Sequence, residues 1–185
     1  MALTNGLVVM TPTSIATGGG SGTINADGSV SFSSAYDVTL NGVFNSSYDN
    51  YMVSITSYAN TTGAYNYAAR LRSSGSDIAS NYTHQIISAY SGVIGVGLGA
   101  SQTFLRWGQV ASTYWCGHTI YLFGPYTNST TNVRSLDLNS ETNKRIYDCA
   151  AYLDSSASCD GFKFGVEGFS ASTITGHITV FGFNK

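Results

Sequence analysis

Three histidines are the first residues of this sequence that could hold a metal ion or move a proton: His84, His118 and His177. Zinc sites use histidine ligands, and a local site usually has closely spaced pairs of them. No histidine here has another at i,i+2 or i,i+4, and all three lie in segments with strand-like alternation. We therefore expect ordinary strand histidines, with no metal site and no cofactor.

The run Gly95-Val96-Gly97-Leu98-Gly99 is the closest approach to a nucleotide-binding motif. A dinucleotide fingerprint needs G-x-G-x-x-G ahead of a helix whose N-terminus faces the phosphate. The spacing differs here, and no helical pattern follows. These glycines therefore indicate a strand or a turn.

Residues for hydrolytic chemistry are sparse. A glycosidase needs two facing carboxylates, and the 10 Asp and Glu residues show no telling pair. Hydrolysis by Asp148 or Glu167 in a cleft stays open as an alternative. The sequence has no G-x-S-x-G nucleophile elbow. We predict no catalytic residues and no enzymatic activity.

The three cysteines, Cys116, Cys149 and Cys159, have no regular spacing. Their odd number argues against a complete disulfide framework, so we expect buried free thiols. A bridge between Cys149 and Cys159 across a hairpin stays open, because a sequence does not show its geometry.

The composition limits the classes of protein that are possible. The 185 residues suit one domain, or one domain with an arm. Only 10% of the residues are charged, with a net charge of −2 and 8 Lys and Arg. This excludes the basic face that a nucleic-acid binder needs, and weak charge repulsion permits self-association. No apolar run approaches the roughly 20 residues of a membrane span, and the N-terminus lacks the basic region of a signal peptide.

Alternating apolar and polar residues predict β-strands along most of the chain. The clearest unit is Tyr36–Ser57, which we interpret as a strand, a turn and a second strand. Within it we expect Phe44, Tyr48 and Tyr51 to pack a structural corner. About ten short strands with turn residues between them favour an all-β fold. We predict a jelly-roll-like antiparallel β-sandwich, with a meander-type barrel as the alternative.

Residues 1–28 differ from the rest and predict an extended N-terminal arm ahead of a β-sandwich domain at 29–185. The run Gly18-Gly19-Gly20-Ser21-Gly22 has the composition of a flexible linker. An apolar arm needs a surface to lie on, and we expect it to bind a partner through Leu7, Val8, Val9, Met10, Pro12 and Ile15. The alternative is that it adds an edge strand to its own domain.

Several motifs together resemble those of small virion structural proteins of tailed bacteriophages. They are MTPTSIA (10–16) before the glycine-rich linker, LNGVF (40–44) with SSYDNY (46–51), ARLR (69–72) with SSGSD (73–77), and TGHITVFGF (175–183). The resemblance implies a β-sandwich that forms a homotrimer and has no catalytic residues. Such proteins are similar to capsid decoration (cement) proteins. That similarity implies binding to the major capsid protein of the same phage, on the outer surface of the capsid.

The alternative within this class is a tail-fibre or receptor-binding module. It would hold a host-surface glycan on loops rich in Tyr, Asn and Ser, because exposed tyrosines suit such recognition. A secreted carbohydrate hydrolase is a third possibility, which the sparse carboxylates disfavour.

Overall fold

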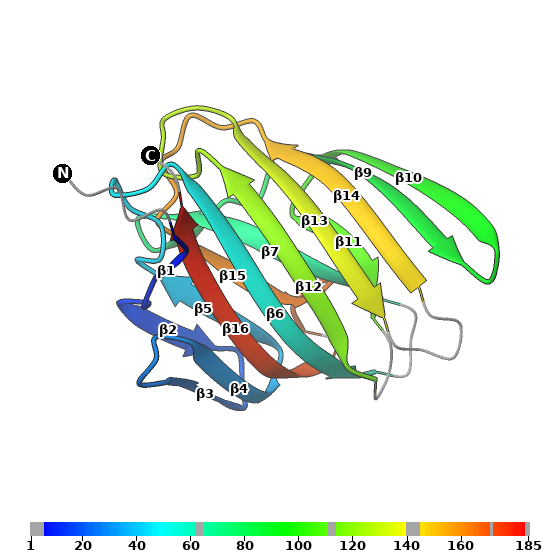
Figure 1. Ribbon diagram of the computed structural model, residues 1–185, viewed down its shortest axis with the longest axis horizontal. Helices are drawn as coiled ribbons and strands as arrows, with labels where there is room; N and C mark the ends of the chain where they lie inside the picture. Colours follow the sequence, from blue (N-terminus) through cyan, green and yellow to red (C-terminus); the bar gives the residue numbers. More distant parts are fainter. Residues whose placement is uncertain (1–5, 62–64, 111–113, 140–144, 171, 184–185) are drawn as a thin grey trace.

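The computed structural model describes residues 6–61, 65–110, 114–139, 145–170 and 172–183, and this part of the chain holds sixteen β-strands and no helix. The strands form two antiparallel sheets that pack face to face (Figure 1). The all-β sandwich expected from the alternating sequence is therefore confirmed, while jelly-roll connectivity stays a prediction. Within the described ranges, no helix exists that could cross a membrane.

The larger sheet is formed by β1 Val8–Val9, β3 Ser21–Ile24, β4 Val30–Ala35, β6 Asn50–Asn60, β9 Tyr82–Tyr90, β10 Val93–Gln102, β12 Cys116–Phe123, β13 Thr131–Asn139, β14 Arg145–Leu153 and β16 Thr173–Phe183. Their order across the sheet is β10-β9-β14-β13-β12-β6-β16-β4-β3, with β1 beside β16. The long strands β6 and β16 pair over their whole length, and β12, β13 and β14 follow as a meander.

The smaller sheet is formed by β2 Ser14–Thr17, β5 Asp37–Asn41, β7 Asn66–Ser73, β8 Ser76–Asp77, β11 Leu105–Gln109 and β15 Gly161–Val166. Its order is β11-β7-β15-β5-β2, with β8 beside β7. This sheet covers one face of the larger sheet, and the β9–β10 hairpin extends beyond it at one end (Figure 1). No described element covers the opposite face of the larger sheet, which is turned toward the viewer in Figure 1.

Strand alternation forms the core between the two sheets. In β6, for example, Tyr51, Val53 and Ile55 point inward and are at most 1% exposed. At the centre, the ring of Phe164 stacks against Tyr67 at 5.6 Å and against Trp107 at 6.1 Å between centroids. Each large apolar side chain buried in this way stabilises the fold by roughly 1.5–3 kcal/mol.

The expected N-terminal arm needs correction, because residues 8–24 are edge strands of the sandwich itself. β1 pairs with β16, β2 with β5, and β3 with β4. Met10 and Pro12 are buried, and Ile15 packs against the core. The physical reason is that an extended segment leaves its N–H and C=O groups unpaired unless it joins a sheet. Residues 1–5 of the expected arm lie outside the described residues.

The expected flexible linker is a tight turn between β2 and β3. Gly19 and Gly20 adopt positive φ values of 72° and 59°. A Cβ atom on Gly20 would lie 2.2 Å from the carbonyl oxygen of Ser33. Glycine is thus required at position 20 by both conformation and close approach, and Ser21 and Gly22 already belong to β3.

Phe44, Tyr48 and Tyr51 pack together at one corner of the sandwich. The ring centroid of Tyr51 lies 4.8 Å from that of Phe44 and 6.3 Å from that of Tyr48, both edge to face. The Tyr51 hydroxyl accepts a hydrogen bond from the N–H of Asn45 at 2.8 Å and donates to its carbonyl at 2.7 Å. These bonds hold the turn before β6 against the core.

All three cysteines are buried, and none of them forms a disulfide. Burial raises the pKa of both Cys149 and Cys159 to about 12. Both are therefore neutral thiols near pH 7, and a Cys149–Cys159 bridge is not formed in this structure.

Candidate functional site

The histidines and glycines considered for metal or nucleotide chemistry do not form a site. His84, His118 and His177 lie on β9, β12 and β16, and the first two are buried. Among the described residues, no group of three His, Cys, Asp or Glu side chains is placed to hold a metal ion. The glycine-rich run of residues 95–99 is part of β10.

The two carboxylates considered for hydrolysis form separate ion pairs. Asp148 lies 2.9 Å from the guanidinium of Arg134, on the larger sheet. Glu167 follows β15 of the smaller sheet, where it pairs with Arg106 and accepts a hydrogen bond from the Asn66 side chain at 2.9 Å. The structure therefore places these two carboxylates on different sheets, each with its own cation.

His118 and Asp137 form a buried polar cluster that the sequence did not reveal. The Nδ1 atom of His118 lies 2.5 Å from Oδ1 of Asp137, and the Ser135 hydroxyl donates to Oδ2 at 3.1 Å. Burial raises the pKa of Asp137, and its hydrogen bond with His118 opposes that rise. The two side chains of the pair are at most 2% exposed. The cluster therefore pairs the Asp137 carboxylate inside the core, and its burial keeps it from a substrate.

The candidate site is instead the outer face, which we define as the side chains of the larger sheet that point away from the smaller sheet. On this face a large set of apolar residues is more than a third exposed: Val9, Ile87, Ile94, Val96, Leu98, Phe123, Leu136, Leu138, Ile146 and Tyr152. A soluble monomer rarely exposes large apolar side chains in such numbers on one face. The outer face is therefore a candidate interface with another molecule.

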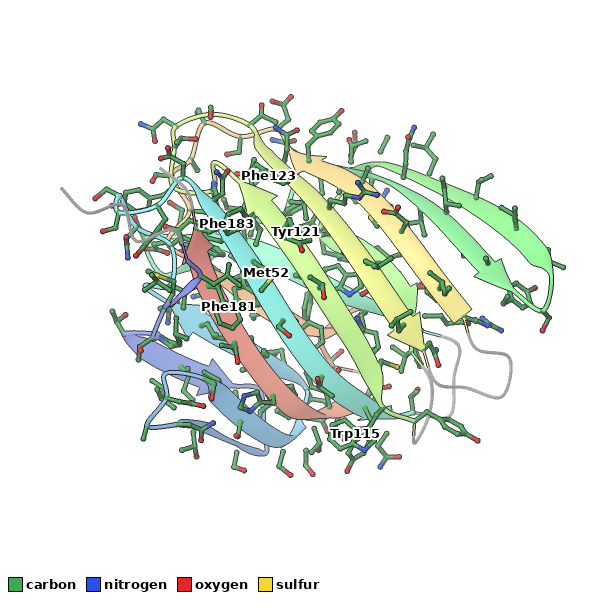
Figure 2. The ribbon with its side chains drawn as sticks, viewed as in Figure 1. Met52, Trp115, Tyr121, Phe123, Phe181 and Phe183 are labelled. Carbon is green, nitrogen blue, oxygen red and sulfur yellow. The ribbon has the colours of Figure 1, made fainter. Side chains whose placement is uncertain are left out.

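The part of the outer face around β1, β16, β6 and β12 is its aromatic end. Val9, Phe181, Met52 and Tyr121 occupy one row across these four strands. Figure 2 shows Phe183 and Phe123 close to this row, and the rings of Tyr121 and Phe183 meet edge to face with centroids 6.3 Å apart. Next to them lies a shallow depression of about 420 Å³ lined by Tyr121, Phe123, Arg134, Leu136 and Phe183.

Two of the residues expected to bind a partner, Leu7 and Val9, are exposed, and Val9 belongs to the row of the aromatic end. Leu7 is 52% exposed and Val9 is 39% exposed. The other four expected residues point elsewhere or contribute to the sandwich: Val8 is half-buried, Ile15 is partly buried, and Met10 and Pro12 are buried. The structure therefore separates the expected set into two exposed residues and four that pack on their own domain.

The part of the outer face on β13, β14, β9 and β10 is its aliphatic end. Leu138, Ile146, Ala89 and Ile94 form one row across these strands. Leu136, Ile87 and Val96 share the adjacent row with Asp148. The exposed fractions are high, from 49% for Leu136 to 85% for Val96. This end therefore presents aliphatic side chains over the width of four strands.

Arg134 and Asp148 are the charged residues of the outer face on the described strands β6, β9, β10, β12, β13, β14 and β16. The Arg134 guanidinium donates two hydrogen bonds to the Asp148 carboxylate, from Nη2 to Oδ2 at 2.9 Å and from Nε to Oδ1 at 3.3 Å. Their hydrogen bond and opposite charge raise the pKa of Arg134. Because the two charges cancel, the outer face has no net charge. Its apolar residues gather at the aromatic end and the aliphatic end, and the polar row of Thr179, Ser54 and Thr119 lies beside them.

Sequence reasoning missed most of the outer face, although a signal was present. Strands with one solvated face alternate apolar and polar residues, whereas strands covered on both faces carry apolar residues at both parities. β9 has consecutive Ile86 and Ile87, and β13 has Val133 on one parity with Leu136 and Leu138 on the other. These sequences have the pattern of strands that are covered on both faces.

Comparisons with known proteins add little to this picture. No protein-family model matches the chain, and no curated protein matches it. Among solved structures, it is similar to the CBM2 module of the evolved Dit of Lactobacillus casei BL23 phage J-1. The sequence identity is 6%, the alignment covers 80% of this chain and 70% of that chain, and the TM-score is 0.25. At that TM-score the likeness carries no argument, so the function must be inferred from the surface and from the sequence motifs.

Proposed function

We propose that this chain is a non-enzymatic structural protein of a tailed bacteriophage, and specifically a capsid decoration protein that binds the outside of the head shell. The observation that carries the proposal is the uncovered outer face of the larger sheet, which has no net charge and exposes apolar side chains at its aromatic and aliphatic ends. The phage assignment is supported by the resemblance of the turn-and-strand motifs to virion structural proteins. The outer face supports an assembly role.

The physical chemistry of the outer face suits a protein partner. The centre of a protein interface is depleted in charge and enriched in aromatic residues and methionine. The aromatic end has this composition, with Met52, Tyr121 and Phe123 on neighbouring strands. A shell offers many identical sites, so copies held near one another gain avidity without a strong single contact.

The interior of the sandwich supports a structural role as well. The space between Val53, Leu71, Trp107 and Phe162 measures about 10 Å³. This is about the volume that one water needs, and its walls are apolar. A ligand would not fit in this space, whereas the outer face exposes many apolar side chains that a partner could cover.

A tail-fibre or receptor-binding role is the second candidate, favoured by the aromatic end. The depression beside Tyr121 and Phe123 also contains Arg134, so aromatic rings and hydrogen-bond donors lie together. Such a combination suits a sugar, because rings cover its apolar face and polar groups bind its hydroxyls. A glycan array with the isolated protein tests this role directly.

The test of the main proposal compares binding to purified heads and purified tails of the phage that encodes the protein. Bound protein is measured by co-sedimentation for the wild type and for two outer-face variants, Phe123→Lys and Leu138→Lys. Ala16→Lys is the matched control, because it adds the same charge at an exposed position of β2 on the other sheet. Deleting residues 1–28 is a poor test, because the deletion removes three strands of the sandwich.

We expect wild type and Ala16→Lys to bind heads equally, and both outer-face variants to lose at least about tenfold in affinity, which corresponds to about 1.4 kcal/mol. Equal binding of all four proteins to heads would overturn the assignment of the outer face. Binding to tails but not to heads, or to a glycan on the array, would overturn capsid decoration in favour of the second candidate.

A further inference from the structure

The β9–β10 hairpin leaves a long open edge at one end of the larger sheet. Its turn, Ser91-Gly92, has φ values of 47° and 78°, as in the two-residue type I′ turns that connect antiparallel strands. β10 runs from Val93 to Gln102 and pairs with β9 on one side. Its other side is the free end of the sheet, and the hairpin projects away from the sandwich (Figure 1).

Three residues of β10 direct their backbone N–H and C=O groups toward this open edge. Tyr90 and Val93 flank the turn as a pair, and such a pair exchanges both of its hydrogen bonds in a two-residue hairpin. Hydrogen-bonded and non-hydrogen-bonded pairs then alternate along the ladder. Gly95 and Gly97 therefore bond to β9, whereas Ile94, Val96 and Leu98 have groups that point outward. The open stretch ends at Ala100, whose carbonyl accepts a hydrogen bond from the Gln102 side chain at 2.8 Å.

From Val93 to Gly99 this edge lacks the protection that natural proteins usually give to edge strands, because the register shift of β10 comes only between Gly99 and Gln102. Protected edges are short, bulged, or carry Lys or Pro. From Ile78 to Leu105 the sequence contains no Asp, Glu, Lys, Arg or Pro. The other terminal strands of the described sheets, β3, β2 and β11, have only four or five residues each, whereas β10 has ten. β10 is therefore the edge best suited to receive another strand.

We propose that β10 pairs in antiparallel fashion with β10 of a second copy of this chain, on a two-fold axis through Val96. In this register Val96 meets Val96 of the other copy, and Ile94 meets Leu98 in both directions. All three residues with outward backbone groups then find a partner. A register centred on Gly97 would instead place Ile94 opposite Ala100, whose carbonyl already accepts the Gln102 bond.

The side chains of β10 are self-complementary in the proposed register. Ile94, Val96 and Leu98 lie on the outer face, so each apolar side chain meets another apolar side chain across the axis. On the inner face, Gly95 meets Gly97, and neither presents a side chain that could clash. The β9–β10 hairpin has no charged residue, so no like-charge repulsion opposes the pairing of two identical copies.

The two-fold axis would be perpendicular to the sheet, so the outer faces of both copies would lie on the same side. The aliphatic ends would meet at the axis and form one continuous apolar surface. If the proposed function holds, a pair of copies would bind two sites of the shell at once and gain avidity. The pairing itself does not depend on that function. It replaces, as our proposal, the three-fold assembly that the family resemblance implied.

The first test measures the oligomeric state of the isolated full-length protein by sedimentation velocity over a range of concentrations. Val96→Lys would place two like charges on the axis, whereas Leu138→Lys adds the same charge to the outer face away from β10. Val96 is 85% exposed, so its replacement should leave the fold intact, and circular dichroism checks this. We expect a wild-type dimer, at least about tenfold weaker association for Val96→Lys, and a normal dimer for Leu138→Lys. A wild-type monomer, or a trimer unaffected by Val96→Lys, would overturn the proposal.

The second test determines which residues of the two β10 strands lie opposite each other. The Cβ atoms of a directly opposed hydrogen-bonded pair lie about 5 Å apart in an antiparallel ladder, too far for an unstrained disulfide but within the reach of a short bifunctional thiol reagent. With such a reagent Val96→Cys should therefore give a covalent dimer, and Ile94→Cys should not, because Ile94 opposes Leu98 of the other copy and lies about four residues from the second Ile94. The native cysteines are buried and do not compete. Equal cross-linking of both variants, or none by Val96→Cys, would contradict the proposed axis. Both tests use the isolated protein, so their failure leaves shell binding a separate question.

Discussion

Asp137 and Leu138 are neighbours in β13, yet the carboxylate lies in the core at 1% exposure and the leucine lies outside at 57% exposure. Side chains of a strand alternate between faces, so one placement requires the other. Inside, Asp137 binds His118 and Ser135; outside, Leu138 extends the aliphatic end of the outer face. A shift of one residue would exchange the faces of every side chain in β13 and would separate Asp137 from His118.

Replacing Asp137 should destabilise the fold. In Asp137→Ala, the Ser135 hydroxyl loses its acceptor, and His118 Nδ1 loses the carboxylate and keeps only the Trp107 N–H at 3.3 Å. The loss of such buried hydrogen bonds costs roughly 1–3 kcal/mol. Equilibrium urea unfolding followed by circular dichroism measures the change. The control is Asp148→Ala, which removes an exposed ion pair worth less than about 1 kcal/mol. Equal losses for the two variants would show that the buried cluster contributes nothing specific.

Acid should destabilise the protein through His84. Burial lowers the pKa of His84 below 6.5, and the nearby charge of Arg106 lowers it further. Because the unfolded chain binds a proton near pH 6.5 and the folded chain only at lower pH, the free energy of unfolding falls as the pH drops through this interval. In His84→Phe this part of the pH dependence should disappear. Urea unfolding between about pH 7.5 and about pH 5 measures it, above the range where most carboxylates titrate. The same slope in both proteins would contradict the assignment.

Tyr51→Phe should destabilise the corner that precedes β6. The variant keeps the ring contacts with Phe44 and Tyr48 but leaves the backbone groups of Asn45 without the hydroxyl. We expect a loss of about 1–2 kcal/mol, measured as a lower midpoint of urea unfolding. Tyr36→Phe is the control, because Tyr36 is 42% exposed. The interpretation of the corner fails if the control loses as much stability.

Two neighbouring glycines test whether residues 18–22 form a turn or a linker. Both Gly19 and Gly20 have positive φ, so alanine at either position costs about 1 kcal/mol or more. A Cβ on Gly19 meets only the Tyr36 ring at 3.4 Å, whereas a Cβ on Gly20 meets the Ser33 carbonyl at 2.2 Å. Thermal unfolding should therefore show a larger loss for Gly20→Ala than for Gly19→Ala. A flexible linker would tolerate both substitutions without loss.

The sequence determined the all-β class of this protein, because apolar and polar residues alternate with period two along most of the described strands. It also indicated the corner of Phe44, Tyr48 and Tyr51, since aromatic residues beside a turn have few places to pack. The composition of residues 18–22 suggested a linker, but the same glycines are needed for a tight turn with positive φ. Composition alone does not distinguish these cases, because flexibility and a fixed left-handed conformation both favour glycine.

Which face of each strand is covered was decided only by the tertiary structure. In β13, the leucines at positions 136 and 138 alternate as core residues would, yet they lie outside because Asp137 meets His118 of β12 inside. The same holds for β10, whose glycines face inward and whose aliphatic residues face solvent beside the open edge. Alternation in the sequence shows that the two faces of a strand differ. Only the contacts with neighbouring strands and with the other sheet decide which face is buried.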